Sequence, residues 1–257
     1  MNKYIIYEQP VAENVRNFLK CEYLYEKYSF AIAQEDIWNI RSSISTLLEI
    51  SDFTLRINLK IELLKELEKL KIHVSYLRNN NLLEIVKYEN YLKDINVCLD
   101  NLNEIDVSPS KSIVSNDFLM QIKNKLHIPA GDNFFDMPSY LNFLLSNKNT
   151  IVDNINFWYQ PFEHLFISSK LILDIKRGNS KFNNLISNGS FFEKKLDINT
   201  KIDLVRIKLL TNSNIFPDVS VNRQNINIIF KTSYGNKMLS KAVDENIDFE
   251  LSLSGIK

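Results

Sequence analysis

Apolar and polar residues alternate with two different periods in this chain, and the period changes near Gly178. Before that glycine, apolar residues recur every three or four positions, as on one face of an amphipathic helix. Beyond it, segments with a period of two are typical of half-buried strands: GSFFEKKLDI, KIDLVRIKLL, NINIIFKTSY and NIDFELSLS. The pattern predicts an α+β protein, with an all-helical domain over residues 1–178 and an antiparallel β-sheet domain over residues 179–257. The apolar segment 4–7 is a candidate to join that sheet.

The most regular helical pattern lies in the middle of the predicted helical domain. Its apolar residues follow spacings of three and four in two runs: Leu63, Leu67, Leu70, Val74 and Leu77, then Ile85, Tyr88, Leu92, Ile95, Leu99 and Leu102. The polar segment RNNN (78–81) separates the runs. This pattern predicts a long helical hairpin with a coiled-coil-like seam. Such a hairpin is typical of a structural or interaction element.

The segment IPAGDNFFDMP (128–138) interrupts the helical pattern with two prolines and a glycine. We interpret it as a rigid corner between two helices, in preference to a ligand loop. Gly131 is the predicted site of positive φ. Phe134 or Phe135 is expected to anchor the corner in the core. Asp136 and Pro138 are expected to start the next helix.

Composition excludes several classes of function. Lys+Arg and Asp+Glu number 31 each, so no overall field attracts nucleic acid or anionic lipid. No apolar run approaches the length of a membrane span, and Cys21 and Cys98 are expected to be buried, reduced thiols of a cytoplasmic protein. The five glycines form no phosphate-binding loop, and the three histidines have no metal-ligand spacing. We therefore predict no catalytic residue, no metal site and no cofactor.

Several segments, taken in order along the chain, carry a resemblance to a known family. They are YEQPVAENVRNFLKCEYLY (7–25), ELLKELEKLK (62–71), IPAGDNFFDMP, NGSFF (188–192), LVRIKL, FPDVS and IDFELSL. In this order they resemble the ZapD family, whose members are bacterial cell-division accessory proteins. The resemblance implies a cytoplasmic homodimer at the midcell division site, without enzymatic activity, cofactor, nucleic-acid binding or membrane insertion. It also implies that the partner is the C-terminal tail of FtsZ, an extended peptide held at a basic pocket, so that the dimer cross-links and bundles FtsZ filaments.

This chain keeps only some of the basic residues that the family pattern carries. An arginine of the pattern is replaced at Asp117 or Phe118, a histidine at Leu141, and arginines at Asn225 and Ile229. The basic residues that remain as candidates for binding the FtsZ tail are Arg56, Lys60, Lys123, Arg206, Arg223 and Lys231. The alternative hypothesis is a dimeric scaffold of the same fold whose peptide pocket has drifted to another partner or to none.

Overall fold

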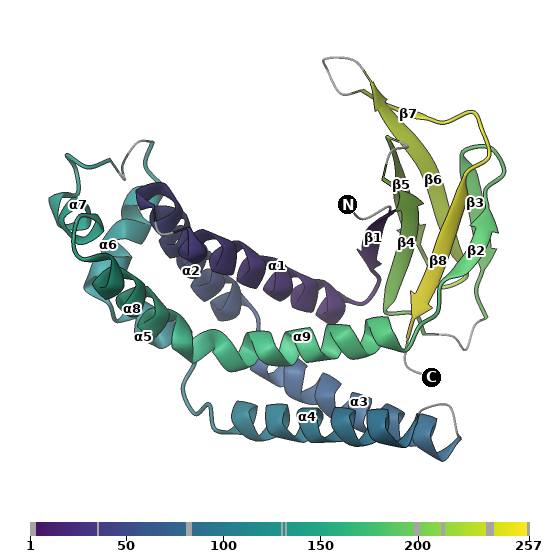
Figure 1. Cartoon of the computed structure of the whole chain (residues 1–257), viewed down its shortest axis with the longest axis horizontal. Helices are drawn as coiled ribbons and strands as arrows, with labels where there is room; N and C mark the ends of the chain where they lie inside the picture. Colours follow the sequence, from purple (N-terminus) through teal and green to yellow (C-terminus); the bar gives the residue numbers. More distant parts are fainter. Residues whose placement is uncertain are drawn as a thin grey trace. The chain divides into compact units, whose positions relative to one another are not determined.

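The computed structural model describes residues 4–255, except 35, 81–83, 130, 132, 198–200, 212–213 and 235–238. Helices occupy the N-terminal part of the chain and antiparallel strands the C-terminal part, which confirms the predicted α+β class (Figure 1). The chain divides into two compact units, one of residues 17–172 and the other of residues 1–16 and 173–257. We call them the helical unit and the β unit.

The helical segments begin and end close to the positions that the apolar period indicates. They are α1 (Glu13–Ala33), α2 (Ile37–Arg56), α3 (Leu59–Asn79), α4 (Ile85–Asn103), α5 (Ser110–Val114), α6 (Asp117–Leu126), α7 (Pro138–Leu144), α8 (Lys148–Tyr159), the 3₁₀ turn η1 (Gln160–Phe162) and α9 (Glu163–Gly178). Three of the described helices, α2, α6 and α8, start at a side-chain cap, and at α8 the side chain of Asn147 accepts a hydrogen bond from the amide of Asn149. Asp36 accepts hydrogen bonds from the amides of Trp38 and Asn39, and Asn116 accepts one from the amide of Leu119.

Helices α3 and α4 form the predicted long hairpin. Leu63, Leu67 and Val74 of α3 are fully buried, as are Ile95 and Leu102 of α4. Burial does not extend along the whole predicted seam, because the α4 residues before Ile95 are exposed or half-buried. Large apolar side chains of the hairpin that remain mostly exposed are Ile72, Tyr76, Ile85 and Val86.

The corner at residues 128–138 joins α6 to α7, and Pro138 is the first residue of α7 as predicted. The prediction of positive φ at Gly131 is wrong. Among the described residues, positive φ occurs at Gly189 and Asn214. What requires a glycine at 131 is space, since a Cβ there would lie 2.5 Å from the carbonyl oxygen of Lys125. Phe135 is 82% exposed and does not anchor the corner, whereas the ring of Phe134 lies against Trp38.

Both cysteines are buried, free thiols in the helical unit. Burial raises the pKa of the Cys21 thiol to about 12, from an ordinary value of 9.0. Burial also raises the pKa of Cys98. Because the thiolate is the nucleophile, both thiols are held in their unreactive form at neutral pH.

We expect neither thiol to react with a disulfide reagent at pH 8 in the native protein, and both to react after denaturation in guanidinium. The contribution to stability follows from the sign of the shift. The raised pKa stabilises the fold below pH 9, and this stabilisation is lost as the pH rises from 9 toward the folded pKa of Cys21. Rapid labelling of the native protein would contradict this burial.

The β unit contains two antiparallel sheets (Figure 1). Their strands are β1 (Tyr4–Pro10), β2 (Asn183–Ile186), β3 (Phe191–Lys195), β4 (Leu204–Leu210), β5 (Ile215–Val221), β6 (Asn225–Tyr234), β7 (Leu239–Ala242) and β8 (Asp248–Ser254). One sheet has the order β1-β4-β8-β2, and the other has the order β3-β6-β5 with β7 also paired to β6. We call them sheet A and sheet B. The N-terminal strand thus lies in sheet A, where Tyr4 is opposite Leu210.

Alternate residues of the strands form one core between the two sheets. Sheet A contributes Val205, Ile207 and Leu251, and sheet B contributes Ile228 and Phe230. The other face of sheet A carries polar residues, including Arg206 and Lys208. This is the period-two pattern of the sequence, with one face buried and the other polar.

Two ion-pair groups join the last turn of α9 to sheet A and its flanking segments within the β unit. The Nζ atom of Lys176 lies 2.6 Å from Oδ2 of Asp203, and both side chains are almost completely buried. Arg177 donates two hydrogen bonds to the carboxylate of Glu8 on β1, at 2.9 and 2.6 Å. Arg206 of β4 also contacts that carboxylate, at 3.1 Å. The carboxylate of Glu8 therefore neutralises part of the charge of two guanidinium groups.

Candidate functional site

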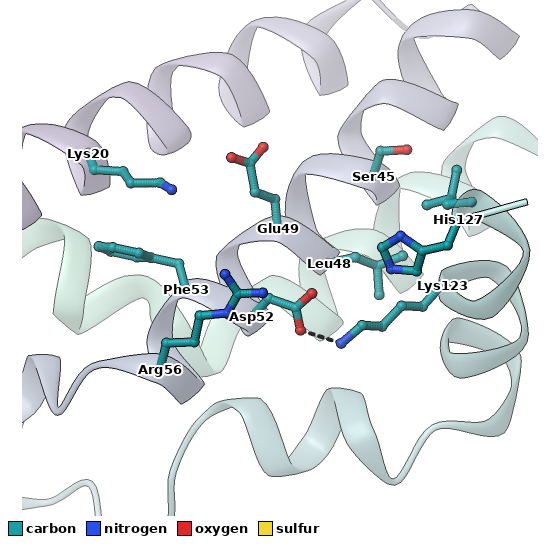
Figure 2. A pocket seen from close by; sticks show the side chains of 10 residues that line it. Lys20, Ser45, Leu48, Glu49, Asp52, Phe53, Arg56, Lys123 and His127 are labelled. Carbon is teal, nitrogen blue, oxygen red and sulfur yellow. Dashed lines mark hydrogen bonds and ion pairs between the residues drawn. The ribbon is translucent and has the colours of Figure 1, made fainter.

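The best candidate for a binding site is a cavity of about 320 Å³ in the helical unit. Figure 2 shows the side chains that surround it. The lining residues come from α1, α2, α6 and the residue after α6: Lys20, Ser45, Leu48, Glu49, Asp52, Phe53, Arg56, Lys123, Leu126 and His127. We call this cavity the α2 pocket, because α2 supplies most of its residues.

The α2 pocket is built on one face of a single helix. Its α2 residues, from Ser45 to Arg56, are separated by alternating steps of three and one, which places them on one stripe of the helix surface. Lys20 of α1 lies on one side of this stripe, and Lys123 of α6 on the other (Figure 2). A stripe with this spacing normally packs into a core. Here it mixes charged and apolar residues and borders an open cavity.

Both carboxylates of the α2 pocket already have a basic partner within the protein. Asp52 forms an ion pair with Lys123, and Glu49 forms one with Lys27 at 3.2 Å. The pocket's other two basic side chains, those of Lys20 and Arg56, have weaker interactions within the protein. The Nζ of Lys20 lies 5.0 Å from the centre of the Phe53 ring, and Arg56 has no hydrogen bond or ion pair within the described part of the chain.

The pocket therefore has an excess of positive charge above an apolar surface. Lys20, Arg56 and Lys123 are opposed by Glu49 and Asp52, and the Lys27 ion pair neutralises Glu49 from outside the pocket. Leu48, Phe53 and Leu126 supply the apolar surface. A guanidinium group without a carboxylate partner favours a ligand that carries one, because charge-assisted hydrogen bonds are the strong ones. The arrangement suits an extended acidic segment with an apolar side chain.

Two of the six residues predicted from the sequence, Arg56 and Lys123, line the same cavity. A third, Lys60, belongs to the first turn of α3 in the same unit. Its Nζ donates a 2.7 Å hydrogen bond to the carbonyl oxygen of Ile105, after the end of α4. Lys60 thus supports the hairpin and is not among the pocket's lining residues.

The other three predicted residues belong to the β unit. Arg206 on sheet A is 11% exposed and lies between Glu8, the carbonyl of Arg177 and the ring of Phe182. Burial lowers the pKa of Arg206, and the carboxylate of Glu8 opposes that shift. Lys231 on sheet B pairs with Asp218. Arg223 is an exposed residue in the turn between β5 and β6. Their part in binding stays a prediction, and Arg206 has a structural role whether or not it binds a partner.

The site prediction from the sequence missed eight of the ten lining residues of the pocket, among them Lys20, Phe53 and His127. None of them stands in a motif with chemical meaning. The available signal was the α2 stripe itself, because Glu49, Asp52 and Arg56 share the spacing of the buried residues on the same helix. The stripe that mixes Leu48 and Phe53 with these three charged residues is the surface of α2 that borders the cavity.

The described residues offer little for other kinds of site. No helix among them combines the length and the apolar character that crossing a membrane requires. Nor do they contain a group of three or more His, Cys, Asp or Glu side chains that could hold a metal ion. In a comparison with protein families, the family model ZapD, described as a cell division protein, matches residues 19–229. The matched range contains every residue of the α2 pocket.

Proposed function

Because the chain belongs to the ZapD family of cell division proteins, we propose that it binds the C-terminal tail of FtsZ and cross-links FtsZ filaments in the cytoplasm at midcell. The proposed role is that of a non-enzymatic accessory protein. The observation that supports it best is the α2 pocket, which combines an apolar surface with an arginine, Arg56, that has no ion pair among the described residues. A disordered tail can bind in such a pocket in extended form, because binding needs only a few contacts between the tail and the pocket.

In the proposed complex, a carboxylate of the tail pairs with Arg56 and a second approaches Lys20. An apolar side chain of the tail packs on Phe53 and Leu48. The ion pair between Lys123 and Asp52 holds one wall of the pocket in place. Each exposed ion pair contributes little alone, so we expect weak binding by a single site that weakens further as salt is added.

Cross-linking requires two such sites in one assembly. We propose that the protein acts as a homodimer that presents one α2 pocket per copy. When one pocket is occupied, the second encounters neighbouring tails of the same filament bundle at a high effective concentration. Weak single sites are then sufficient for filament bundling.

The test of the α2 pocket is to remove the positive charge of Arg56. We expect Arg56→Ala to weaken binding of an FtsZ tail peptide by about tenfold, the loss of one charge-assisted contact of about 1.4 kcal/mol. Fluorescence anisotropy with the labelled peptide measures the affinity, and co-sedimentation with FtsZ measures bundling. Lys111→Ala is the matched control, because it removes one exposed positive charge of the same unit, away from the pocket. We expect that variant to bind as the wild type does.

Three other outcomes would each redirect the proposal. Loss of binding in Arg223→Ala, with Arg56→Ala unaffected, would place the tail on the β unit. Loss of binding in Tyr76→Ala alone would place it on the exposed apolar residues of the α3–α4 hairpin. Absence of any FtsZ binding by the wild-type protein would favour the alternative, a scaffold of this fold with a different partner.

A further inference from the structure

The polar face of sheet A carries a hollow of about 460 Å³, which shares no residue with the α2 pocket. Side chains from all four strands of the sheet line it, and all of them belong to the β unit. The volume is within the range of ligand-binding clefts, about 300–1,000 Å³. The last turn of α9 contacts one end of this face, where Arg177 binds Glu8, and the hollow lies toward the other end. We call it the sheet A hollow.

Side chains on this face form rows that cross the strands, because residues paired on neighbouring strands point to the same side of a sheet. In the first row, Glu8 is opposite Arg206, and the two form an ion pair. In the second row, Lys208 is opposite Glu250, and these two form an ion pair at 2.9 Å. Each of these carboxylates thus has a cation directly opposite it on the next strand.

The third row does not follow this pattern. It contains Tyr4 opposite Leu210, and Asp248 opposite Ile186. Leu210 and Asp248 each lie two residues beyond the ion pair of the second row, so the two halves of the third row are adjacent. Asp248 is exposed and has no hydrogen bond or ion pair among the described residues. The apolar side chains around it are Tyr4, Leu210 and Ile186, which are 40%, 50% and 64% exposed.

Lys208 forms no ion pair with Asp248, because its ammonium group has other partners. Its Nζ lies 2.9 Å from the carboxylate of Glu250, 4.3 Å from the centre of the Tyr4 ring and 5.7 Å from the centre of the Phe182 ring. The hollow is therefore lined by one cation and two carboxylates, next to apolar side chains. This charge balance is the opposite of that in the α2 pocket, which favours an acidic ligand.

We propose that the sheet A hollow binds an extended segment of a partner protein that carries a lysine or arginine between two apolar residues. The cation pairs with Asp248. On one side of it an apolar side chain packs on Tyr4 and Leu210, and on the other side a second one packs on Ile186. The row crosses four strands spaced about 4.8 Å apart, so it is about 14 Å long, the length of about four extended residues. This site goes beyond the proposed function, because it takes a basic segment and the α2 pocket takes an acidic tail.

The probe is a seven-residue peptide of serine with leucine at its second and sixth positions and lysine at its fourth. Alternate side chains of an extended peptide point the same way, so it presents its cation between two leucines. The counterpart peptide has glutamate in place of lysine. Each is titrated to millimolar concentration into the isotope-labelled full chain, and NMR amide shifts report binding. We expect the lysine peptide, and not the glutamate peptide, to shift amides of β1, β2, β4 and β8.

Three variants test the role of the carboxylate. Asp248→Asn should raise the dissociation constant of the lysine peptide by about fivefold, the loss of one exposed ion pair. Ile186→Lys should do the same, because it supplies the missing cation from the neighbouring strand. Asp248→Lys should reverse the preference and bind the glutamate peptide. The matched control, Asp244→Asn, removes a carboxylate of the same unit whose side chain is 92% exposed outside the hollow, and it should bind as the wild type does.

Several outcomes would overturn the proposal. They are equal binding of the two peptides, undiminished binding by folded Asp248→Asn and Ile186→Lys, and the absence of shifts on sheet A in the wild type. Shifts of the same amides on concentrating the protein without peptide would show that a second copy occupies the hollow, which also overturns it. The FtsZ-tail site is tested separately, since Arg56→Ala should leave binding of the lysine peptide unchanged.

Discussion

Replacing Lys176 with methionine is expected to lower the free energy of unfolding by about 3–5 kcal/mol. Its ammonium group lies 2.6 Å from the carboxylate of Asp203, and the two side chains are only 2% and 8% exposed. Methionine fills a similar volume but leaves the carboxylate buried without its partner. Chemical denaturation followed by circular dichroism measures the loss.

Two further variants separate charge from packing. The double variant Lys176→Met with Asp203→Leu removes both charges, and we expect it to recover most of the lost stability. Lys208→Met breaks a more exposed ion pair of the same unit, with side chains 25% and 26% exposed, and should cost about 1 kcal/mol or less. The explanation fails if Lys176→Met is no more harmful than Lys208→Met.

Gly131→Val is expected to lower the free energy of unfolding by about 2–3 kcal/mol, the typical cost of forcing extra atoms into a packed site. A Cβ at this position would lie 2.5 Å from the carbonyl oxygen of Lys125 and 2.8 Å from Cβ of Ile128. The carbonyl is backbone at the end of α6, so the helix end or the corner must move. Thermal unfolding measures the loss of stability.

Gly189 supplies the control, because it is a glycine for a different reason. Its φ is +58° and no atom lies within 4 Å of an added Cβ. Asparagine tolerates this conformation, so Gly189→Asn should lower the free energy of unfolding by less than about 1 kcal/mol. Gly131→Asn adds a Cβ at the crowded position, so it should destabilise the protein about as much as Gly131→Val does. At a temperature where Gly131→Val is folded, its affinity for the tail should be unchanged. Lost affinity at an unchanged melting temperature would show that the corner touches the partner.

Local periodicity was sufficient to predict most of the elements. The spacing of leucines predicted the α3–α4 hairpin, and alternation predicted β3, β4, β6 and β8, because both signals depend on residues close in sequence. Strand β5 was missed because it carries Pro217 and Asp218, which disfavour strands except at an edge. The positive φ expected at Gly131 was wrong because close packing also requires a glycine, and sequence does not distinguish the two causes.

The candidate site was harder to predict from the sequence than the helices and strands were. The six basic residues were chosen from a family resemblance, and they belong to both units of the chain. Arg56 and Lys123 line one pocket because α2 packs near α6, a contact that no local pattern encodes. No local pattern encodes the environment of Arg206 either. This residue lies on the polar face of sheet A, but its guanidinium group forms an ion pair with Glu8, on a strand far away in sequence.

The pairing of β1 with β4 also has a consequence for the order of folding. Tyr4 is opposite Leu210, so about two hundred residues are synthesised between the two strands. At about 5–20 residues per second, β1 waits on the order of ten seconds or more for its partner strand. Throughout that time, an apolar segment rich in strand-forming residues has no sheet to join, while the α3–α4 hairpin can form from neighbouring residues. The newborn chain is thus most prone to aggregate before β4 emerges, and a chaperone that holds the N-terminal segment should raise the yield of folded protein.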